Sequence, residues 1–130
     1  MKILITGGGG FLGFRLARTL LARGQLGGKA ITGITLLDGA FPSGIKDLDE
    51  KKVKAVTGDV SNAGTITSVC TPDTDAVFHL AAVVSGAAEA DFDLGMRVNL
   101  KGMELLLERM RRIATSGNKL PRLVYTSSVA

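Results

Sequence analysis

Four consecutive glycines, Gly7 to Gly10, follow directly on the short apolar run Lys2–Thr6. Each glycine loses more backbone freedom on folding than any other residue, so such a run needs a structural or functional reason. The run Lys2–Thr6 is rich in β-branched residues and stops at the glycines, which predicts a buried strand. From Phe11 to Arg23 leucines recur every four residues and Gly24 follows, which predicts a helix with one apolar stripe. The glycines therefore join a strand to a helix without any spacer.

The rest of the chain continues this alternation of strands and helices. Further strands are predicted over residues 34–37, 53–57, 76–80 and 123–126, and helices over 63–69 and 96–110. The second of these helices rests on an apolar stripe made by Met96, Leu100, Met103, Leu107 and Met110. Residues 25–33 and 81–90 are predicted as loops, and 40–50 as a loop with at most one helical turn. Because the strands are apolar throughout, we expect a doubly wound parallel α/β sheet, Rossmann-like, with about five strands and helices on both faces.

Composition and charge exclude several classes of protein. The 130 residues are enough for one domain, and 45% apolar with 22% charged residues is ordinary for a globular protein. Sixteen basic and twelve acidic residues give a net charge of +4, but no aromatic residues interleave the basic run 97–122, so we expect no nucleic-acid partner. No apolar run has membrane-spanning length, and no Cys/His cluster indicates a metal site. The single cysteine, Cys70, fits a reducing compartment, so we expect a cytoplasmic protein with no membrane partner.

A strand, a glycine turn and a helix in succession are typical of a phosphate-binding site. The amino terminus of the helix offers unpaired N–H groups and partial positive charge to a pyrophosphate. The glycines fit two spacings, GxGxxG from Gly8 and GxxGxxG from Gly7, and both end at Gly13. No Lys-Ser/Thr pair follows, which excludes the P-loop of ATPases.

Asp38 ends the second predicted strand, where a carboxylate can accept hydrogen bonds from both hydroxyls of an adenosine ribose. The same carboxylate would repel a 2′-phosphate, and no arginine lies between Gly39 and Ile45 to neutralise one. We therefore expect NAD, rather than NADP, as the cofactor. An Asp-Gly turn without a ligand role is the alternative interpretation.

Five short motifs occur in order: TGGGGFLG, LLD ending at Asp38, GDV at residues 58–60, HLAA at residues 79–82, and VYTSSVA at the end. Together they resemble the extended short-chain dehydrogenase/reductases, the NAD-dependent epimerase/dehydratase family, over essentially all 130 residues. That family uses the GxxGxxG spacing, which implies that Gly7, Gly10 and Gly13 are the working glycines. The stretches LLDGAFPSG and VVSGAAEADFDLGMRVN are more narrowly similar to the D-erythronate dehydrogenase branch, which oxidises a four-carbon sugar acid.

The resemblance implies a cofactor-binding set within an NAD-binding domain over residues 1–130. Asp59 and Val60 match a pair that contacts the adenine, although Asp59 by itself is also explained as a turn residue after a strand. Ala81 and Ala82 match small residues beside the pyrophosphate and the nicotinamide ribose, and Asn99 matches a helix asparagine that supports the site. The full set comprises Gly7, Gly10, Phe11, Leu12, Gly13, Asp38, Asp59, Val60, Leu80, Ala81, Ala82 and Asn99.

Ser128 matches the catalytic serine of the family, whose hydroxyl hydrogen-bonds the reacting oxygen while a tyrosine beside a lysine removes the proton. The Tyr-x-x-x-Lys motif is absent from this sequence, because Val129 stands four residues after Tyr125. We therefore interpret Tyr125 as a packing residue, and the single histidine, His79, as a structural residue inside an apolar strand. We expect a longer enzyme that continues into a substrate lobe, and no activity from residues 1–130 alone.

The leading hypothesis is an NAD-dependent oxidoreductase that acts on a sugar-derived hydroxyl, that of a sugar acid such as D-erythronate. Within the family, a nucleotide-sugar epimerase or dehydratase is the alternative. A non-catalytic module that senses redox state by binding a dinucleotide is the alternative from another class. The expected partner is a small-molecule substrate, and a homodimer is a further hypothesis for the full-length protein.

Overall fold

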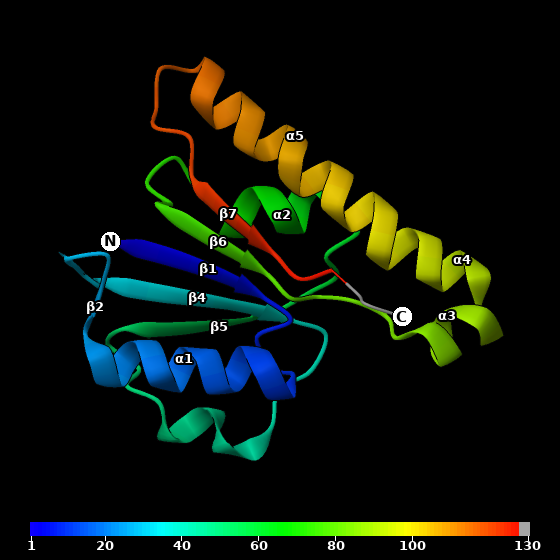
Figure 1. Ribbon diagram of the computed structural model, residues 1–130, viewed down its shortest axis with the longest axis horizontal. Coiled ribbons are helices and arrows are strands. Elements are labelled where there is room, and N and C mark those ends of the chain that lie inside the picture. Colours follow the sequence, from blue (N-terminus) through cyan, green and yellow to red (C-terminus); the bar gives the residue numbers. More distant parts are fainter. Residues whose placement is uncertain (128–130) are drawn as a thin grey trace.

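The computed structural model describes residues 1–127, and its centre is a five-stranded sheet in the order β5-β4-β1-β6-β7 (Figure 1). All neighbouring strands are parallel. The chain begins in the central strand, builds outward to one edge, and then crosses to build the other half. This topology confirms the expected doubly wound α/β fold. The strands are Lys2–Thr6 (β1), Gly33–Asp38 (β4), Val53–Thr57 (β5), Ala76–His79 (β6) and Arg122–Tyr125 (β7).

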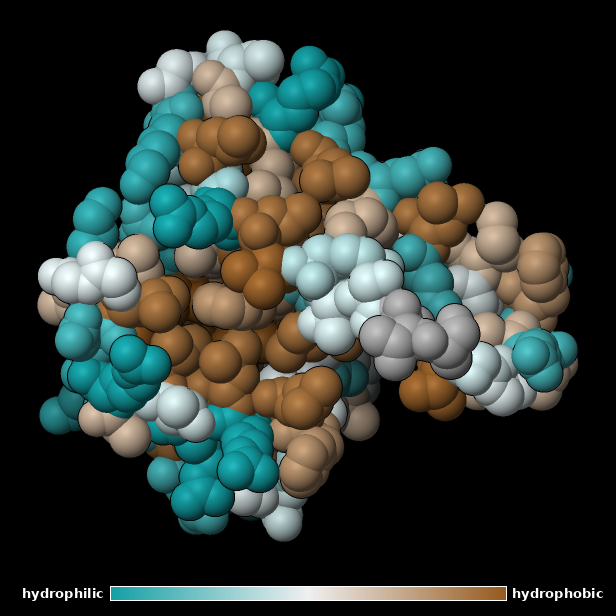
Figure 2. Space-filling view, viewed as in Figure 1, coloured by the Kyte–Doolittle hydropathy of each residue, from teal (hydrophilic) through white to brown (hydrophobic). Residues whose placement is uncertain are grey.

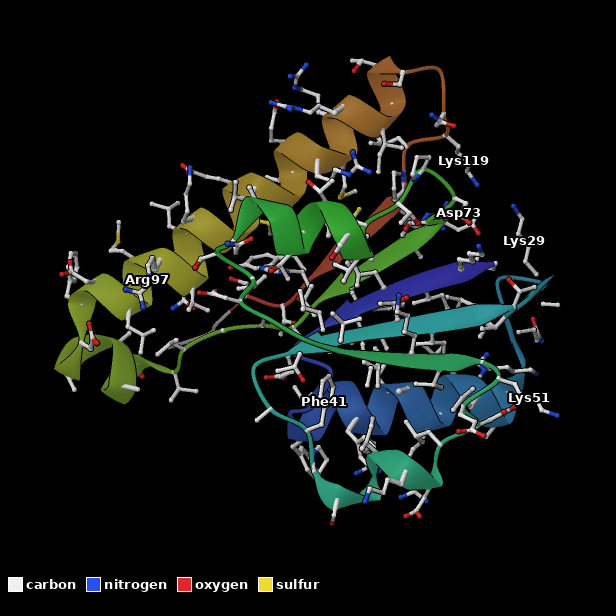
Figure 3. All side chains as sticks on the ribbon, turned by 180° about the vertical axis from the view of Figure 1, so that it is seen from behind. Lys29, Phe41, Lys51, Asp73, Arg97 and Lys119 are labelled. Atoms are coloured by element: carbon white, nitrogen blue, oxygen red, sulfur yellow. The ribbon has the colours of Figure 1, made fainter. Side chains whose placement is uncertain are left out.

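Helices cover both faces of the sheet (Figures 1 and 3). Alternate residues of β1 face opposite sides, so Ile3 and Ile5 belong to one core cluster and Leu4 to another. The first cluster is closed by the helix α1, and the second by α2 and α5. These helices are Phe11–Arg23 (α1), Ala63–Val69 (α2) and Gly102–Thr115 (α5).

The helix ends follow from local sequence. Gly24 ends α1 in the left-handed region (φ 66°), where its N–H donates to the carbonyl of Leu20 at 3.0 Å. Asn62 caps α2, because its side chain accepts the N–H of Thr65 at 2.9 Å. The predicted bounds of β1, α1, β5 and α2 are all confirmed to the residue.

Two connections carry small elements of their own. The predicted loop 25–33 contains a short antiparallel hairpin, Gln25–Leu26 (β2) with Lys29–Ala30 (β3), turned by Gly27 and Gly28 at positive φ. The loop 40–50 holds one 3₁₀ turn, Ser43–Asp47 (η1), as expected.

The region after β6 differs from the prediction. In place of a loop over residues 81–90, Ser85–Ala90 forms a helix (α3), because its alanines favour helix formation. Phe92–Gly95 (α4) follows, capped by Asp91, which accepts the N–H of Leu94 at 2.9 Å. A π-helical segment, Met96–Lys101 (η2), then joins α4 to α5, and together they form one long rod (Figure 1).

The predicted apolar stripe on this rod is wrong in part. Met96, Leu100 and Leu107 are 43%, 49% and 47% exposed, although Met110 is buried as expected. A π-helical turn holds more than 3.6 residues, so a stripe counted at the α-helical period drifts off the buried face when it crosses η2. The residues of α5 that are buried are Gly102, Leu106, Met110 and Ile113.

The face of the sheet that carries α1 is open over β6 and β7 within residues 1–127 (Figure 1). Figure 2 shows hydrophobic side chains gathered on this face between α1 and α5. Val124 on β7 stays 43% exposed there. Throughout these residues, no helix combines the length and the apolar character that crossing a membrane requires.

Candidate functional site

An open cleft of about 600 Å³ lies at the carboxyl ends of the central strands. Its position, where the chain reverses direction across the sheet, is where doubly wound folds bind ligands. Figure 3 places Arg97 and Phe41 toward this end of the molecule, and Lys29, Lys51, Asp73 and Lys119 at the opposite end. Eight residues of the predicted cofactor-binding set line the cleft: Gly7, Gly10, Asp38, Asp59, Val60, Leu80, Ala81 and Ala82.

Three of the four consecutive glycines are required by the fold itself. Gly7 has φ 72°, and a Cβ there would stand 2.7 Å from the carbonyl carbon of Leu80. A Cβ at Gly8 would stand 2.7 Å from that of Leu36, and one at Gly9 would overlap the carbonyl oxygen of Ala40. The turn is therefore packed against β4 and against the backbone that directly follows β4 and β6.

Gly13 belongs to the same packed turn, whereas Gly10 does not. A Cβ at Gly13 would overlap the carbonyl oxygen of Gly7, so this position fixes the approach of α1 to β1. Gly10 has φ −73°, and a Cβ there would meet only the carbonyl oxygen of Gly7, at 3.3 Å. Its bare backbone lines the cleft, so the space left by its missing side chain faces whatever the cleft holds.

The amino terminus of α1 points its donors toward this turn. The first helical hydrogen bond runs from the N–H of Phe14 to the carbonyl of Gly10 at 2.9 Å, which leaves the N–H groups of Phe11, Leu12 and Gly13 ahead of it. The side chains of Phe11 and Leu12 are 78% and 58% exposed. Any contribution of these two residues to an anion is therefore made by the backbone.

Asp38, at the end of β4, ties the glycine turn to its own loop. Its Oδ2 accepts the N–H of Gly9 at 3.0 Å, and its Oδ1 accepts the N–H of Gly39 at 2.7 Å. The residue also lines the cleft. The Asp-Gly turn and a ribose contact, which the sequence presented as alternatives, are thus compatible in one residue.

Asp59 is held in the turn after β5. Its Oδ1 accepts both the N–H and the hydroxyl of Ser61 at 2.7 Å. These hydrogen bonds, and to a smaller extent the charge of Arg97, hold the pKa of the Asp59 carboxyl below its usual range. Asp59 is therefore a carboxylate at neutral pH, and among residues 1–127 no group donates a hydrogen bond to its Oδ2.

The wall facing the glycine turn comes from the region after β6, and sequence reasoning missed part of it. Leu94 on α4 and Val98 on η2 line the cleft opposite Gly10 and Asp38. Their spacing of four residues on a helix was the available signal. Both positions lie two residues before members of the predicted stripe, Met96 and Leu100.

Asn99 does not line the cleft but clamps the loop that does. Its Oδ1 accepts the N–H of Val83 at 2.8 Å, and its Nδ2 donates to the carbonyl of Val83 at 2.9 Å. The π-helical segment aims this side chain at the loop. Asn99 is thus connected to the cleft through the loop that follows β6.

The remaining candidates fall outside the cleft or outside the described residues. His79 is 1% exposed and lies in the core, and Tyr125 stacks against its ring with centroids 6.0 Å apart. Ser128 lies beyond residues 1–127, which are those that the structure describes. Within that range no group of His, Cys, Asp and Glu side chains could hold a metal ion.

Comparison with known proteins places this arrangement in context. The model of the 3-beta hydroxysteroid dehydrogenase/isomerase family matches residues 4–130. D-erythronate dehydrogenase of Cupriavidus necator is 54% identical over the whole chain, which spans 39% of that protein. The nucleoside-diphosphate-sugar epimerase of Agrobacterium tumefaciens is 40% identical with a TM-score of 0.85, over 100% of this chain and 38% of that one. UDP-glucose 4-epimerase of Thermus thermophilus, solved with NAD, is 26% identical with a TM-score of 0.75, over 98% of this chain and 38% of that one.

Proposed function

This chain belongs to the 3-beta hydroxysteroid dehydrogenase/isomerase family, and from that premise we propose that it is the NAD-binding part of an NAD-dependent oxidoreductase acting on a sugar-derived hydroxyl. The chain spans 39% of the Cupriavidus relative, so the activity proposed is that of a longer protein. The membership agrees with the resemblance to extended short-chain dehydrogenase/reductases that the motifs carry.

The observation that carries the proposal is the pairing of a bare Gly10 with the carboxylate of Asp38 on one wall of the cleft. The pyrophosphate of NAD would lie against Gly10 and the free N–H groups at the start of α1. Asp38 would accept the ribose hydroxyls and disfavour a 2′-phosphate. Asp59 and Val60 would hold the adenine, while Ala81 and Ala82 leave room for the nicotinamide ribose.

The chemistry of the reaction is divided between the cofactor and the protein. NAD, when bound, supplies the hydride acceptor. The proposal assigns Ser128 to the reacting oxygen of the substrate, which it would hold by a hydrogen bond. Residues 1–130 contain no Tyr-x-x-x-Lys motif, so we expect them to bind NAD without oxidising a substrate.

For the substrate we propose a small sugar acid, D-erythronate or a close relative. The identity of 54% with a D-erythronate dehydrogenase supports this choice. A nucleotide-sugar epimerase is the second candidate, because the Agrobacterium structure with a TM-score of 0.85 is described as one. We further propose a cytoplasmic protein, in keeping with its one buried cysteine, and a homodimer at full length.

Cofactor choice is tested by calorimetric titration of this chain with NAD and with NADP. We expect NAD to bind more tightly, and Asp38→Ala to shrink the preference. Asp38→Asn keeps the side-chain size and one acceptor while removing the charge, so it separates repulsion of the 2′-phosphate from the tether to Gly9. A parent chain that already prefers NADP would overturn the assignment of Asp38.

Substrate choice is tested on the full-length protein by the absorbance of the reduced nicotinamide. We expect reduction of NAD with D-erythronate, and a loss of about 10²- to 10⁴-fold in turnover for Ser128→Ala. A protein inert toward sugar acids that interconverts nucleotide sugars would favour the second candidate. A protein that binds NAD without turnover of either class would favour the redox-sensing module.

A further inference from the structure

The most deeply buried polar contact near the cleft joins two neighbouring strands. Thr6 and His79 are the last residues of β1 and β6 and stand opposite each other in the sheet. They are 0% and 1% exposed, and the Thr6 hydroxyl lies 2.7 Å from Nδ1 of His79. A polar pair buried among apolar residues is costly unless its hydrogen bonds are complete.

A third group completes this contact and connects it to the cleft. The backbone N–H of Ala81 donates to the Thr6 hydroxyl oxygen at 3.4 Å, and the N–H of Leu80 donates to the Thr6 carbonyl at 3.0 Å. Both residues line the cleft. A Cβ at Gly7 would stand 2.8 Å from the Ala81 nitrogen, so the glycine turn and the Ala81 backbone are in direct contact.

The hydrogen bonds of the Thr6 hydroxyl indicate which ring nitrogen of His79 carries the proton. A threonine hydroxyl has one proton to donate, and here its oxygen already accepts from Ala81. Its proton is then directed at Nδ1 of His79, because within residues 1–127 it has no other acceptor. This arrangement places the ring proton of His79 on Nε2, whereas a ring protonated on Nδ1 would leave the Thr6 hydroxyl proton without an acceptor among residues 1–127. Burial lowers the pKa of His79, which keeps the ring neutral.

We propose that Thr6 and His79 are positioning residues, which act through the Ala81 N–H to set the floor of the dinucleotide cleft. This inference rests on the proposed function of the cleft. His79 extends the same effect to β7, because its ring stacks on Tyr125 and its carbonyl accepts the N–H of Thr126 at 3.4 Å. Thr126 precedes Ser128 by two residues in the sequence. One buried imidazole thus touches both the strand under the cofactor floor and the strand leading to the proposed substrate contact.

The alternative is that the pair stabilises the sheet without any effect on the cleft, and matched threonine variants separate the two. Thr6→Val removes the hydroxyl at nearly constant volume, and Thr6→Ser restores it. Thr74→Val removes a second buried threonine hydroxyl, which accepts the N–H of Thr71 at 3.0 Å before the start of β6, away from the cleft. Urea unfolding and NAD titration are measured on all of them in this chain.

We expect Thr6→Val to weaken NAD binding roughly 2- to 10-fold in the folded protein, the worth of one hydrogen bond. Thr6→Ser should bind like the parent, and Thr74→Val should lose stability without losing NAD affinity. Equal NAD affinity in the parent and in folded Thr6→Val would overturn the inference while leaving the proposed function standing. If Thr6→Val does not fold, Thr6→Ala, which removes the hydroxyl without adding volume, and His79→Asn, which keeps an acceptor near Nδ1, provide the comparison.

A measurement independent of NAD tests the proton count. Nitrogen NMR of the imidazole should show a neutral ring protonated on Nε2 at neutral pH, and Thr6→Ser should keep that tautomer. A ring protonated on Nδ1, or doubly protonated, would overturn the inference whether or not NAD binds. A parent chain that fails to bind NAD while showing the Nε2–H tautomer would instead count against the proposed function of the cleft.

Discussion

The two walls of the cleft are built in different ways. On the wall formed by the glycine turn, backbone packs on backbone, and an added Cβ at Gly9 or Gly13 has no space. The loop after β6, which runs from the floor of the cleft into the opposite wall, is held by side chains: the Thr6 hydroxyl at Ala81 and the Asn99 amide at Val83. Helices α4 and η2 extend that wall away from the sheet (Figure 1).

The two kinds of contact differ in how far they allow each wall of the cleft to change its geometry. A wall whose close neighbours are mostly main-chain atoms has little room to change its geometry. A wall held by individual side-chain hydrogen bonds can lose one of them at a cost of about 1 kcal/mol and remain folded. Under the proposed function, the rigid wall faces the pyrophosphate, and the adjustable wall faces the nicotinamide ribose.

The largest expected effect comes from breaking the rigid wall at Gly13. Gly13→Val should lower the free energy of unfolding by about 4 kcal/mol or more, enough to unfold a marginal domain, because its Cβ would overlap the Gly7 carbonyl oxygen. Urea unfolding followed by circular dichroism measures this. Gly86→Ala on α3 is the control, since a Cβ there meets nothing within 4 Å and should not destabilise the chain. A Gly13→Val chain with the parent's unfolding midpoint would contradict the comparison.

At Gly10 on the same wall, binding rather than folding should fail. Gly10→Val has an allowed φ of −73° and meets only one atom, at 3.3 Å, so we expect a cost in stability of about 1 kcal/mol. NAD affinity should fall about 100-fold or more, because the side chain blocks charge-assisted hydrogen bonds to the pyrophosphate. Calorimetry on the folded variant decides the matter. NAD binding as tight as in the parent would refute the role of Gly10.

On the adjustable wall, Asn99→Ala removes both hydrogen bonds to Val83 and should cost about 1–2 kcal/mol of stability. NAD affinity should fall less than tenfold, well below the effect at Gly10. Asn99→Asp keeps the acceptor for the Val83 N–H but sets a carboxylate oxygen against the Val83 carbonyl oxygen, so it should be no more stable than Asn99→Ala. A loss of affinity for Asn99→Ala as large as that for Gly10→Val would erase the distinction between the walls.

The smallest effect concerns pH and the buried His79. Its pKa is lowered from 6.5 in the folded chain, so below that value the unfolded chain binds more protons than the folded one. This contribution to stability is complete above pH 6.5 and is lost as the pH falls below it toward the folded pKa. The urea midpoint of the parent should therefore drop more between about pH 7.5 and 5 than that of His79→Asn. Equal drops in the two chains would show that His79 titrates normally.

Sequence reasoning recovered the rigid wall more completely than the adjustable one. The strand, turn and helix from β1 to α1 follow from adjacent residues, so periodicity and glycine chemistry predict them. The partner of Asn99 and the pairing of Thr6 with His79 do not, because the latter spans 73 residues and depends on the register of two parallel strands. The burial of His79 was predicted from its apolar neighbours and is confirmed, but no local pattern identifies Thr6 as its partner.

Two predictions on the adjustable wall were wrong, the apolar stripe and the loop over residues 81–90, and each has its own cause. The rule of 3.6 residues per turn assumes a regular helix, and η2 breaks it between Met96 and Lys101. Small residues in 85–90 were also interpreted as a loop, although alanine is the strongest helix former. Leu94 and Val98 were not predicted as cleft residues, because the helix before Met96 was not predicted and the stripe was counted across η2.

The π-helical segment determines how this rod tolerates a change in its length. Gly102, the first residue of α5, packs against Val60, where an added Cβ would stand 3.0 Å from a methyl group, so the inner half of the rod is anchored to the core. Losing a single residue from η2 would let this turn become α-helical while Leu94 keeps its face, because the wider turn already accommodates one extra residue. The same deletion in the α-helical part of α5 would instead rotate everything before it by about 100°. The π-helical segment is thus the place on the rod where a one-residue change in length leaves the outer wall of the cleft in register with the anchored half.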